Sequence, residues 1–217
     1  MNETLAKYKH EVTEQIIRAV TAGNAPWQKP LLGGQAARNA ITGRRYQGIN
    51  QIILRLKDEN ADPRWLTYKQ AQERGWRVKQ GSHGIRITFW KPLIDLETEE
   101  QIGQVQRIFT VFNATQIEGI SEYKPVTSNF ELSNINTYTQ GISERVTRMY
   151  YPEAMKHLIN EISNMFLMCE LGMDYQPLAA SRTQENLQIL SSNSSAIFKA
   201  SAEASRTVNF VLGHKEG

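Results

Sequence analysis

Hydrophobic residues near the N-terminus recur at steps of three and four positions over residues 5–20. This spacing is typical of an amphipathic helix with one apolar face, and Gly23 and Pro26 predict its end. The apolar positions are Leu5, Tyr8, Val12, Ile16, Ala19 and Val20. We therefore expect a helix that packs its apolar stripe against another element.

The next helical patterns are shorter. Isoleucine and leucine spacing predicts a helix marked by Ile49, Ile52, Ile53 and Leu56. Thr67 and Gln70 form a capping box for a helix over residues 68–74, which Gly75 ends.

After Gly75, hydrophobic and polar residues alternate, which predicts strands over residues 76–79, 85–91 and 107–113. In the second strand, the alternation places Arg86 and Trp90 on one face and the aliphatic residues on the other. The acidic residues 92–104 are predicted as a variable hairpin loop.

The second half of the chain favours helices. Residues 120–142 are rich in Ser, Thr and Asn and are predicted as a loop or linker, whereas 143–217 carry helical stripes. One stripe begins after Pro152 and ends at Gly172. The predicted class is α+β, with a small, mainly antiparallel sheet flanked by helices and followed by a C-terminal helical subdomain. The expected domains are 1–119 and 143–217.

Charge divides the chain more sharply than its net value of +3 suggests. Residues 1–92 hold 16 Lys and Arg against 7 Asp and Glu, a net charge of +9. Residues 93–217 hold 9 against 15, a net charge of −6. A basic front half that binds a polyanion, followed by a half with a different task, is the simplest interpretation.

The single cysteine, Cys169, excludes an intramolecular disulfide framework and a cysteine-based zinc site. We interpret Cys169 as core packing. The sequence has no apolar run near the roughly 20 residues that span a bilayer, and no signal-peptide pattern at its start. We therefore expect a soluble, cytoplasmic protein without membrane contact.

Aromatic and cationic residues are interleaved between Trp65 and Trp90, and all four tryptophans lie in the basic half. Such a mixture suits a surface that neutralises phosphates and stacks unpaired bases, and we expect bases on the face of Arg86 and Trp90. The same residues also fit an ordinary core with a solvated face. For Trp27, in a proline-bounded turn, the two interpretations are equally open.

A short loop before Ile49 adds to the first interpretation. Gly43 and Gly48 bracket Arg44, Arg45 and Tyr46, directly ahead of a predicted helix. Glycines let backbone N–H groups approach a phosphate, and a helix N-terminus adds partial positive charge.

Four segments in this order resemble the N-terminal domain of the ArdC antirestriction family, which is also found in TraC-type plasmid primases. They are W-Q-K-P, R-N-A-I-T-G-R-R-Y-Q-G-I-N, the stretch R-W-L-T-Y-K-Q to H-G-I-R-I-T-F-W, and F-T-V-F-N-A-T-Q-I-E-G. The resemblance covers about residues 5–119. It implies a single-stranded DNA (ssDNA)-binding module.

The back half resembles a shortened form of the family's second domain, a zinc-metallopeptidase-like helical domain. Family members carry H-E-x-x-H, which is absent here, and no two of the four histidines are four apart. Glu161 stands where the resemblance implies a third ligand. His157 and Glu161 alone make a poor zinc site, so we expect no metal, no cofactor and no peptidase activity.

The sequence thus predicts a non-enzymatic ssDNA-binding protein of a plasmid, phage or other mobile element. The predicted nucleic-acid-binding residues are Trp27, Asn39, Arg44, Arg45, Tyr46, Asn50, Trp65, Lys69, Arg77, Lys79, Arg86 and Trp90. Trp76 is a further predicted stacking surface. The alternative is a protein-interaction module that inhibits or adapts a host restriction or replication protein. A residual hydrolase based on Glu161 is the third hypothesis.

Overall fold

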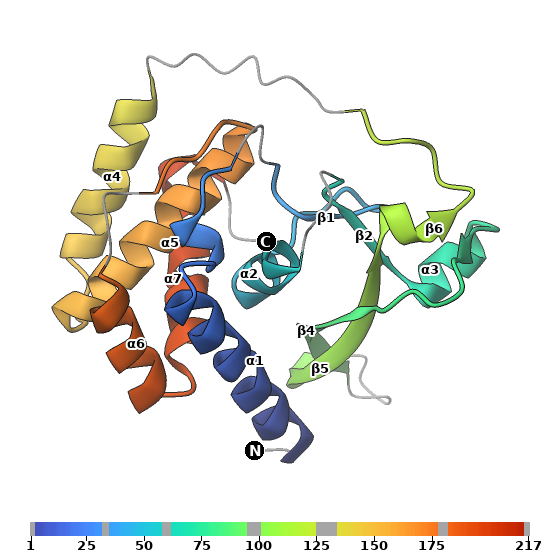
Figure 1. Ribbon diagram of the computed structural model, residues 1–217, viewed down its shortest axis with the longest axis horizontal. Coiled ribbons are helices and arrows are strands. Elements are labelled where there is room, and N and C mark those ends of the chain that lie inside the picture. The colour runs from blue at the N-terminus through green and yellow to red at the C-terminus, as the bar shows by residue number, and fades with distance from the viewer. Residues whose placement is uncertain are drawn as a thin grey trace.

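The computed structural model describes residues 3–31, 35–57, 62–94, 101–124, 134–177 and 182–214. A group of helices and a β-sheet region lie beside each other, with helix α2 between them (Figure 1). The helices are α1 (Glu3–Thr21), η1 (Pro26–Gln28), α2 (Ile49–Leu56), α3 (Tyr68–Glu73), η2 (Ala114–Gln116), α4 (Ile135–Thr147), α5 (Glu153–Leu171), α6 (Thr183–Ser192) and α7 (Ala196–Val211). The strands are β1 (Arg38–Asn39), β2 (Arg64–Thr67), β3 (Arg77–Val78), β4 (Ile85–Ile94), β5 (Gln101–Asn113) and β6 (Ile117–Glu118).

The main sheet has four strands in the order β1-β2-β5-β4. Its β1–β2 pair is parallel, and the β2–β5 and β4–β5 pairs are antiparallel. A separate antiparallel pair, β3 and β6, lies near α3. The predicted α+β class with a mainly antiparallel sheet and flanking helices is therefore confirmed.

The largest hydrophobic core is shared by helices from both ends of the chain. The predicted stripe of α1 is buried, with Ile16 and Val20 fully enclosed, and it joins Leu158 and Ile162 of α5 in one cluster. Helix α1 packs on α6, and α2 packs on α7. The core is thus continuous across the boundary predicted at residue 119.

Helix α4 corrects one prediction, because it begins at Ile135, inside the stretch interpreted as linker. Ile142 and Val146 are buried, and with Ile135 and Tyr138 they follow helical spacing. The prediction gave more weight to the polar composition of this stretch than to its periodicity.

Strands β4 and β5 correct a second prediction, the hairpin loop over residues 92–104. Residues 92–94 and 101–104 continue the two strands instead of forming a loop, whereas residues 95–100 lie outside the described residues. Strand β2 was not predicted at all. It lies between two neighbours, and its Trp65 and Leu66 are both buried, so it lacks the alternation of a half-buried strand.

Among the described residues, no helix combines the length and apolarity needed to cross a membrane.

Cys169 lies in the helical core at 1% exposure, and burial raises the pKa of its thiol. The thiolate is the reactive form. The fold therefore lowers the reactivity of Cys169 in two ways, because burial keeps reagents out and the raised pKa reduces the thiolate fraction. We expect Cys169 to react with a thiol reagent such as DTNB at least about a thousandfold more slowly in buffer than in denaturing urea. Fast reaction of the folded protein would contradict this placement.

Candidate nucleic-acid interface

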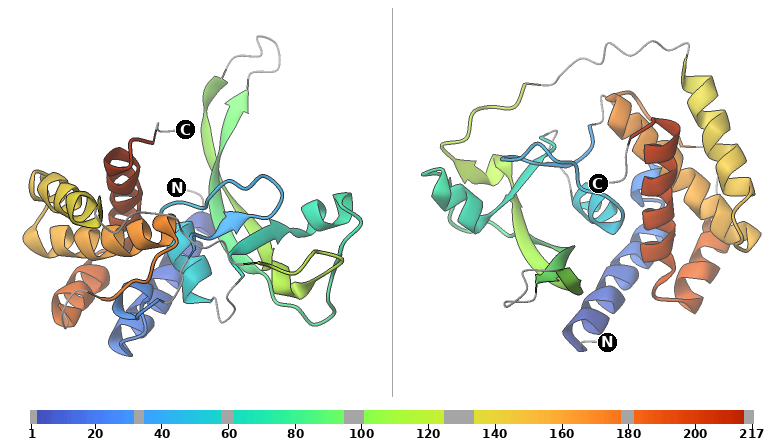
Figure 2. Two further views of the ribbon diagram at one scale, coloured as in Figure 1. Left: turned by 90° about the horizontal axis from the view of Figure 1, so that it is seen from above. Right: turned by 180° about the vertical axis from the view of Figure 1, so that it is seen from behind.

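The β4–β5 hairpin extends well beyond the core. Its outer part projects from the body of the molecule (Figure 2). Several large hydrophobic side chains on it are exposed by 39% or more, and Trp90 reaches 63%. These residues are Phe89, Trp90, Leu93, Ile94 and Phe109. Singly exposed apolar residues are ordinary, but a cluster on a projecting hairpin marks a contact surface.

One face of the hairpin carries a row of rings. Phe89 lies 5.9 Å from Tyr46 and 5.9 Å from Phe109, measured between ring centroids. Tyr46 is buried and supports Phe89 from below, whereas Phe89 and Phe109 remain 42% and 39% exposed. This face, defined here as the Phe89 face, therefore presents two aromatic rings held in place by a third.

Two cationic residues share the Phe89 face, and a third lies in the neighbouring loop. Arg107 is the register partner of Phe89, and Lys91 follows two residues along β4, so both belong to the same side of the hairpin. Both are exposed, as is Arg44 in the loop that carries Tyr46. The segment 95–100 is acidic in sequence. The three cations therefore favour phosphates near Phe89, whereas the acidic sequence of 95–100 disfavours them there.

The opposite face carries Arg86 and Trp90, as the alternation predicted. However, Arg86 forms an ion pair with Glu11 of α1 and lies over the ring of Tyr8, 5.9 Å from its centroid. This partner offsets the charge that Arg86 was expected to offer to phosphates. Trp90 is exposed there without a neighbouring ring among the described aromatic pairs.

Asn39 organises the loop between β1 and α2. Its Oδ1 accepts hydrogen bonds from the backbone N–H groups of Ile41 and Thr42, at 3.0 Å each, and its Nδ2 donates to the hydroxyl of Tyr46 at 3.3 Å. Gly48 closes the loop at φ +57°, a left-handed conformation that favours glycine. Asn39 thus positions Tyr46, and its own amide is engaged.

Asn50 fixes the free edge of β4. Its Nδ2 donates to the carbonyl of Thr88 at 2.6 Å, and its Oδ1 accepts from the Thr88 N–H at 3.0 Å. Strand β4 is an edge strand, so this amide replaces the missing neighbour strand at one residue. The predicted site residue Asn50 is therefore buried, and its two hydrogen bonds to the backbone of Thr88 orient the hairpin.

Three predicted aromatic contacts are core residues instead. Trp27, Tyr46 and Trp65 are 1%, 4% and 2% exposed, so none offers a ring face to a base in this structure. Trp27 lies in the helical core, and Trp65 packs with Ile87 under the loop. These residues follow the usual burial of large aromatics, which the sequence pattern alone did not separate from contact residues.

The remaining predicted cations lie at the other end of the sheet region, with α3 and the β3–β6 pair (Figure 1). Lys69 is 3.8 Å from Glu73, and the Lys79 Nζ donates to the Thr115 carbonyl at 2.7 Å. Lys79 borders an open pocket of about 480 Å³ that also contains Arg64 and Asp62. Arg77 is exposed beside β6. The predicted nucleic-acid-binding residues therefore divide between the region of the β4–β5 hairpin and the region of α3 and the β3–β6 pair.

The predicted stacking residue Trp76 is half-buried in a small cluster beside α3.

Sequence reasoning missed Phe89, Phe109 and Arg107 as site residues. The available signal was the alternation that places Phe89 opposite Trp90, together with the phenylalanine at 109. It was not decisive because the alternation groups Phe89 with Ile85 and Ile87, on the face expected to be apolar, and because the strand was expected to end near residue 91.

A sequence model of the N-terminal domain of the anti-restriction factor ArdC matches residues 6–119, just over half of the chain. The chain belongs to the ArdC antirestriction family. Crystal structures of ArdC from plasmid R388 share its fold. The metal-free form has a TM-score of 0.71 and 21% identity, covering 96% of this chain and 99% of that one. The Mn(II)-bound form has a TM-score of 0.74 and 22% identity, covering 94% and 97%.

Two proteins named DNA primase TraC from Escherichia coli are also similar. One is 29% identical over 297 aligned positions, covering 100% of this chain and 28% of the primase. The other is 36% identical over 140 positions, covering 54% and 10%. The chain therefore spans less than a third of either primase. The longer alignment exceeds the 217 residues of this chain, so the primase has additional residues within the matched region.

The Mn(II)-bound relative raises the question of a metal site here. Glu161 accepts a hydrogen bond from Asn186 at 3.0 Å, and burial raises the pKa of its carboxyl. His157 is one turn away on α5. Within the described residues, no three His, Cys, Asp or Glu side chains form a group that could hold a metal ion. The described residues around Glu161 therefore do not fit a metal centre.

Proposed function

We propose that this ArdC-family protein is a non-enzymatic ssDNA-binding protein of the antirestriction type. The observation that carries the proposal is the Phe89 face, where two exposed phenylalanines stand beside Arg44, Lys91 and Arg107. Aromatic side chains stack on unpaired bases of any sequence, at about 1–3 kcal/mol per base, while cations track the phosphates.

The geometry favours single strands over duplex. In duplex DNA the bases are stacked on each other and their faces are inaccessible, so Phe89 and Phe109 would have nothing to stack on. The cations alone would still attract duplex through its phosphates. The difference between the affinities for ssDNA and for duplex therefore measures the contribution of stacking on Phe89 and Phe109.

The relatives suggest a setting for this activity. The antirestriction family, a relative from plasmid R388 and relatives named DNA primase favour a cytoplasmic protein of a mobile element that acts on DNA. Within this proposal, the back half is a shortened, degenerate metallopeptidase-like domain that serves as a scaffold. It packs against the front half through the shared core.

The test is binding to labelled ssDNA and duplex of equal length, measured by fluorescence anisotropy across a salt series. We expect single strands to bind more tightly, with log K falling against log salt by about 0.7 per phosphate neutralised. Arg107→Gln should weaken binding and reduce this slope by about 0.7. Arg148→Gln, the same change at an exposed arginine after α4, is the matched control and should leave the slope unchanged.

No binding at low salt, or equal binding of duplex and single strand, would overturn the proposal. In the first case the exposed apolar residues of the hairpin, including Leu93 and Ile94, favour the second candidate, a protein-interaction module. That module would inhibit or adapt a host restriction or replication protein.

A further inference from the structure

One predicted phosphate-binding arginine already has an anionic partner. Arg45, in the loop beside the Phe89 face, forms an ion pair with Glu170 of α5. The Arg45 side chain is 39% exposed, whereas the Glu170 side chain is only 15% exposed. The pair therefore joins the basic front half to the acidic back half, and the arginine remains reachable from solvent.

A second contact fixes the same loop. The Gly48 N–H donates to the Ser205 Oγ of α7 at 2.8 Å. Both ends of the Arg45–Gly48 segment are thus bound to helices of the back half. Tyr46 lies between them and contacts Phe89, so the attachment of this loop bears directly on the proposed DNA-binding face.

Arg45 also stands close to another cation. Its backbone pairs with that of Arg38 in an isolated bridge, and burial together with the charge of Arg38 lowers the pKa of the Arg45 guanidinium. The site therefore favours a nearby anion. Glu170 meets this need in the free protein, and a phosphate oxygen offers the same geometry to an arginine.

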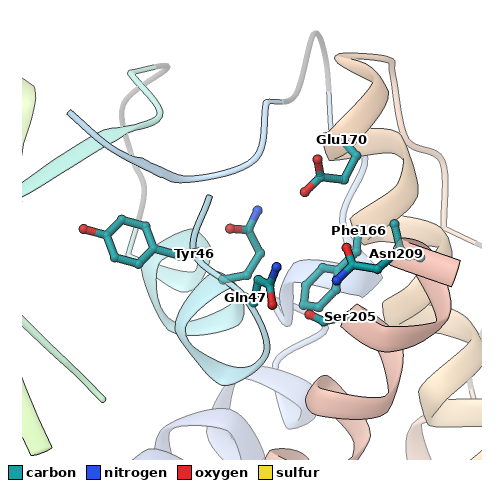
Figure 3. Close-up of a pocket in the computed structure, with 8 residues that line it drawn as sticks. Tyr46, Gln47, Phe166, Glu170, Ser205 and Asn209 are labelled. Atoms are coloured by element: carbon teal, nitrogen blue, oxygen red, sulfur yellow. The ribbon is translucent and has the colours of Figure 1, made fainter. Parts of the chain in front are cut away.

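Removing Arg45 from a largely buried carboxylate would ordinarily be costly. The cavity beside the pair provides an alternative partner. Glu170, Ser205 and Asn209 line a cavity of about 10 Å³ together with Gln51 (Figure 3). Gln51 is 3% exposed, and its amide has no hydrogen-bond partner among the described residues. Its Nε2 is therefore a spare donor in the lining of the same cavity as Glu170.

We propose that Glu170 is an internal competitor of DNA phosphate for Arg45. In the free protein Glu170 holds Arg45, and in the complex Arg45 turns to a phosphate while the carboxylate is taken over by donors of the cavity. The back half then sets the affinity of the front half. This inference rests on the proposed function, because it concerns the same ligand.

The test compares Glu170→Gln with wild type in the anisotropy assay. The variant should bind ssDNA about threefold more tightly at low salt, and its salt slope should steepen by about 0.7 because one more phosphate is neutralised. Glu144→Gln is the matched control. It removes the same charge from an exposed position on α4, which lies on the side of the helices away from the sheet (Figure 1), and should change neither quantity.

A double substitution identifies the competing group. Arg45→Gln should weaken binding more in the Glu170→Gln background than in wild type, because only the former leaves Arg45 uncommitted. If Glu170→Gln loses its cooperative thermal transition, Glu170→Asp replaces it, and its shorter carboxylate should give a smaller gain in affinity. Unchanged or weaker ssDNA binding by a folded Glu170 variant would overturn the proposal that Glu170 competes with phosphate for Arg45. Absence of ssDNA binding by wild type and Glu170→Gln alike overturns the proposed function itself.

Discussion

Replacing Phe89 by alanine is expected to weaken ssDNA binding about tenfold or more, whereas replacing Trp90 should change it by less than about threefold. The two residues are neighbours on β4, both are exposed, and their side chains point to opposite faces of the hairpin. The comparison therefore asks which face stacks the bases. Phe89 is favoured because Tyr46 and Phe109 hold its ring, and because Arg107 lies across from it.

Two measurements separate binding from stability. Phe89→Leu keeps an apolar side chain against Tyr46 but removes the π-face, so it should retain the thermal midpoint and still lose affinity. Thermal unfolding of each variant identifies losses that come from the fold. A larger effect at Trp90 than at Phe89 would move the bases to the face shared with Arg86, which the sequence pattern had favoured.

The helical part of the fold was predictable because its signal is local. The stripe from Tyr8 to Val20 and the stripe after Pro152 repeat over many turns, and both are buried as expected. The capping box of Thr67 and Gln70 is also present, with the Gln70 N–H donating to the Thr67 hydroxyl at 3.2 Å. Such features depend on residues close in sequence.

The site was only partly predictable because its parts meet through distant contacts. Tyr46 and Phe89 are 43 positions apart in the sequence, and no local pattern shows that one ring supports the other. Composition correctly located aromatics and cations in the front half. It did not show that Trp65 fills the core or that Glu170, from the acidic half, pairs with Arg45. Burial and ion pairing are decided by tertiary packing.

Loss of the Asn50 side chain should cost more stability than its small size suggests. It is 6% exposed, and its amide satisfies both the N–H and the carbonyl of Thr88. Asn50→Ala leaves both groups without this partner beneath α2, at a cost of about 1–3 kcal/mol for each buried group left unpaired. We expect the thermal midpoint to fall by about 4–24 °C, at roughly 2–4 °C per kcal/mol for a chain of this length.

The matched control is Asn164→Ala, because Asn164 is also 6% exposed but, among the described residues, its side chain donates within its own helix, to the Asn160 carbonyl. That carbonyl keeps its helical N–H partner, so the loss should be clearly smaller. Equal losses at the two positions would show that the Asn50 contacts to β4 add no specific stability.

Asn50→Asp tests the direction of the two hydrogen bonds. An ionised carboxylate still accepts from the Thr88 N–H but cannot donate to the Thr88 carbonyl, and burial disfavours its charge. The pKa of the introduced carboxyl is therefore raised in the folded protein. Stability should be highest below the unfolded-state pKa and fall as the pH rises through the folded-state pKa. Because Thr88 precedes Phe89, ssDNA affinity should decline with it, as the edge of β4 loses the contact that orients the aromatic face.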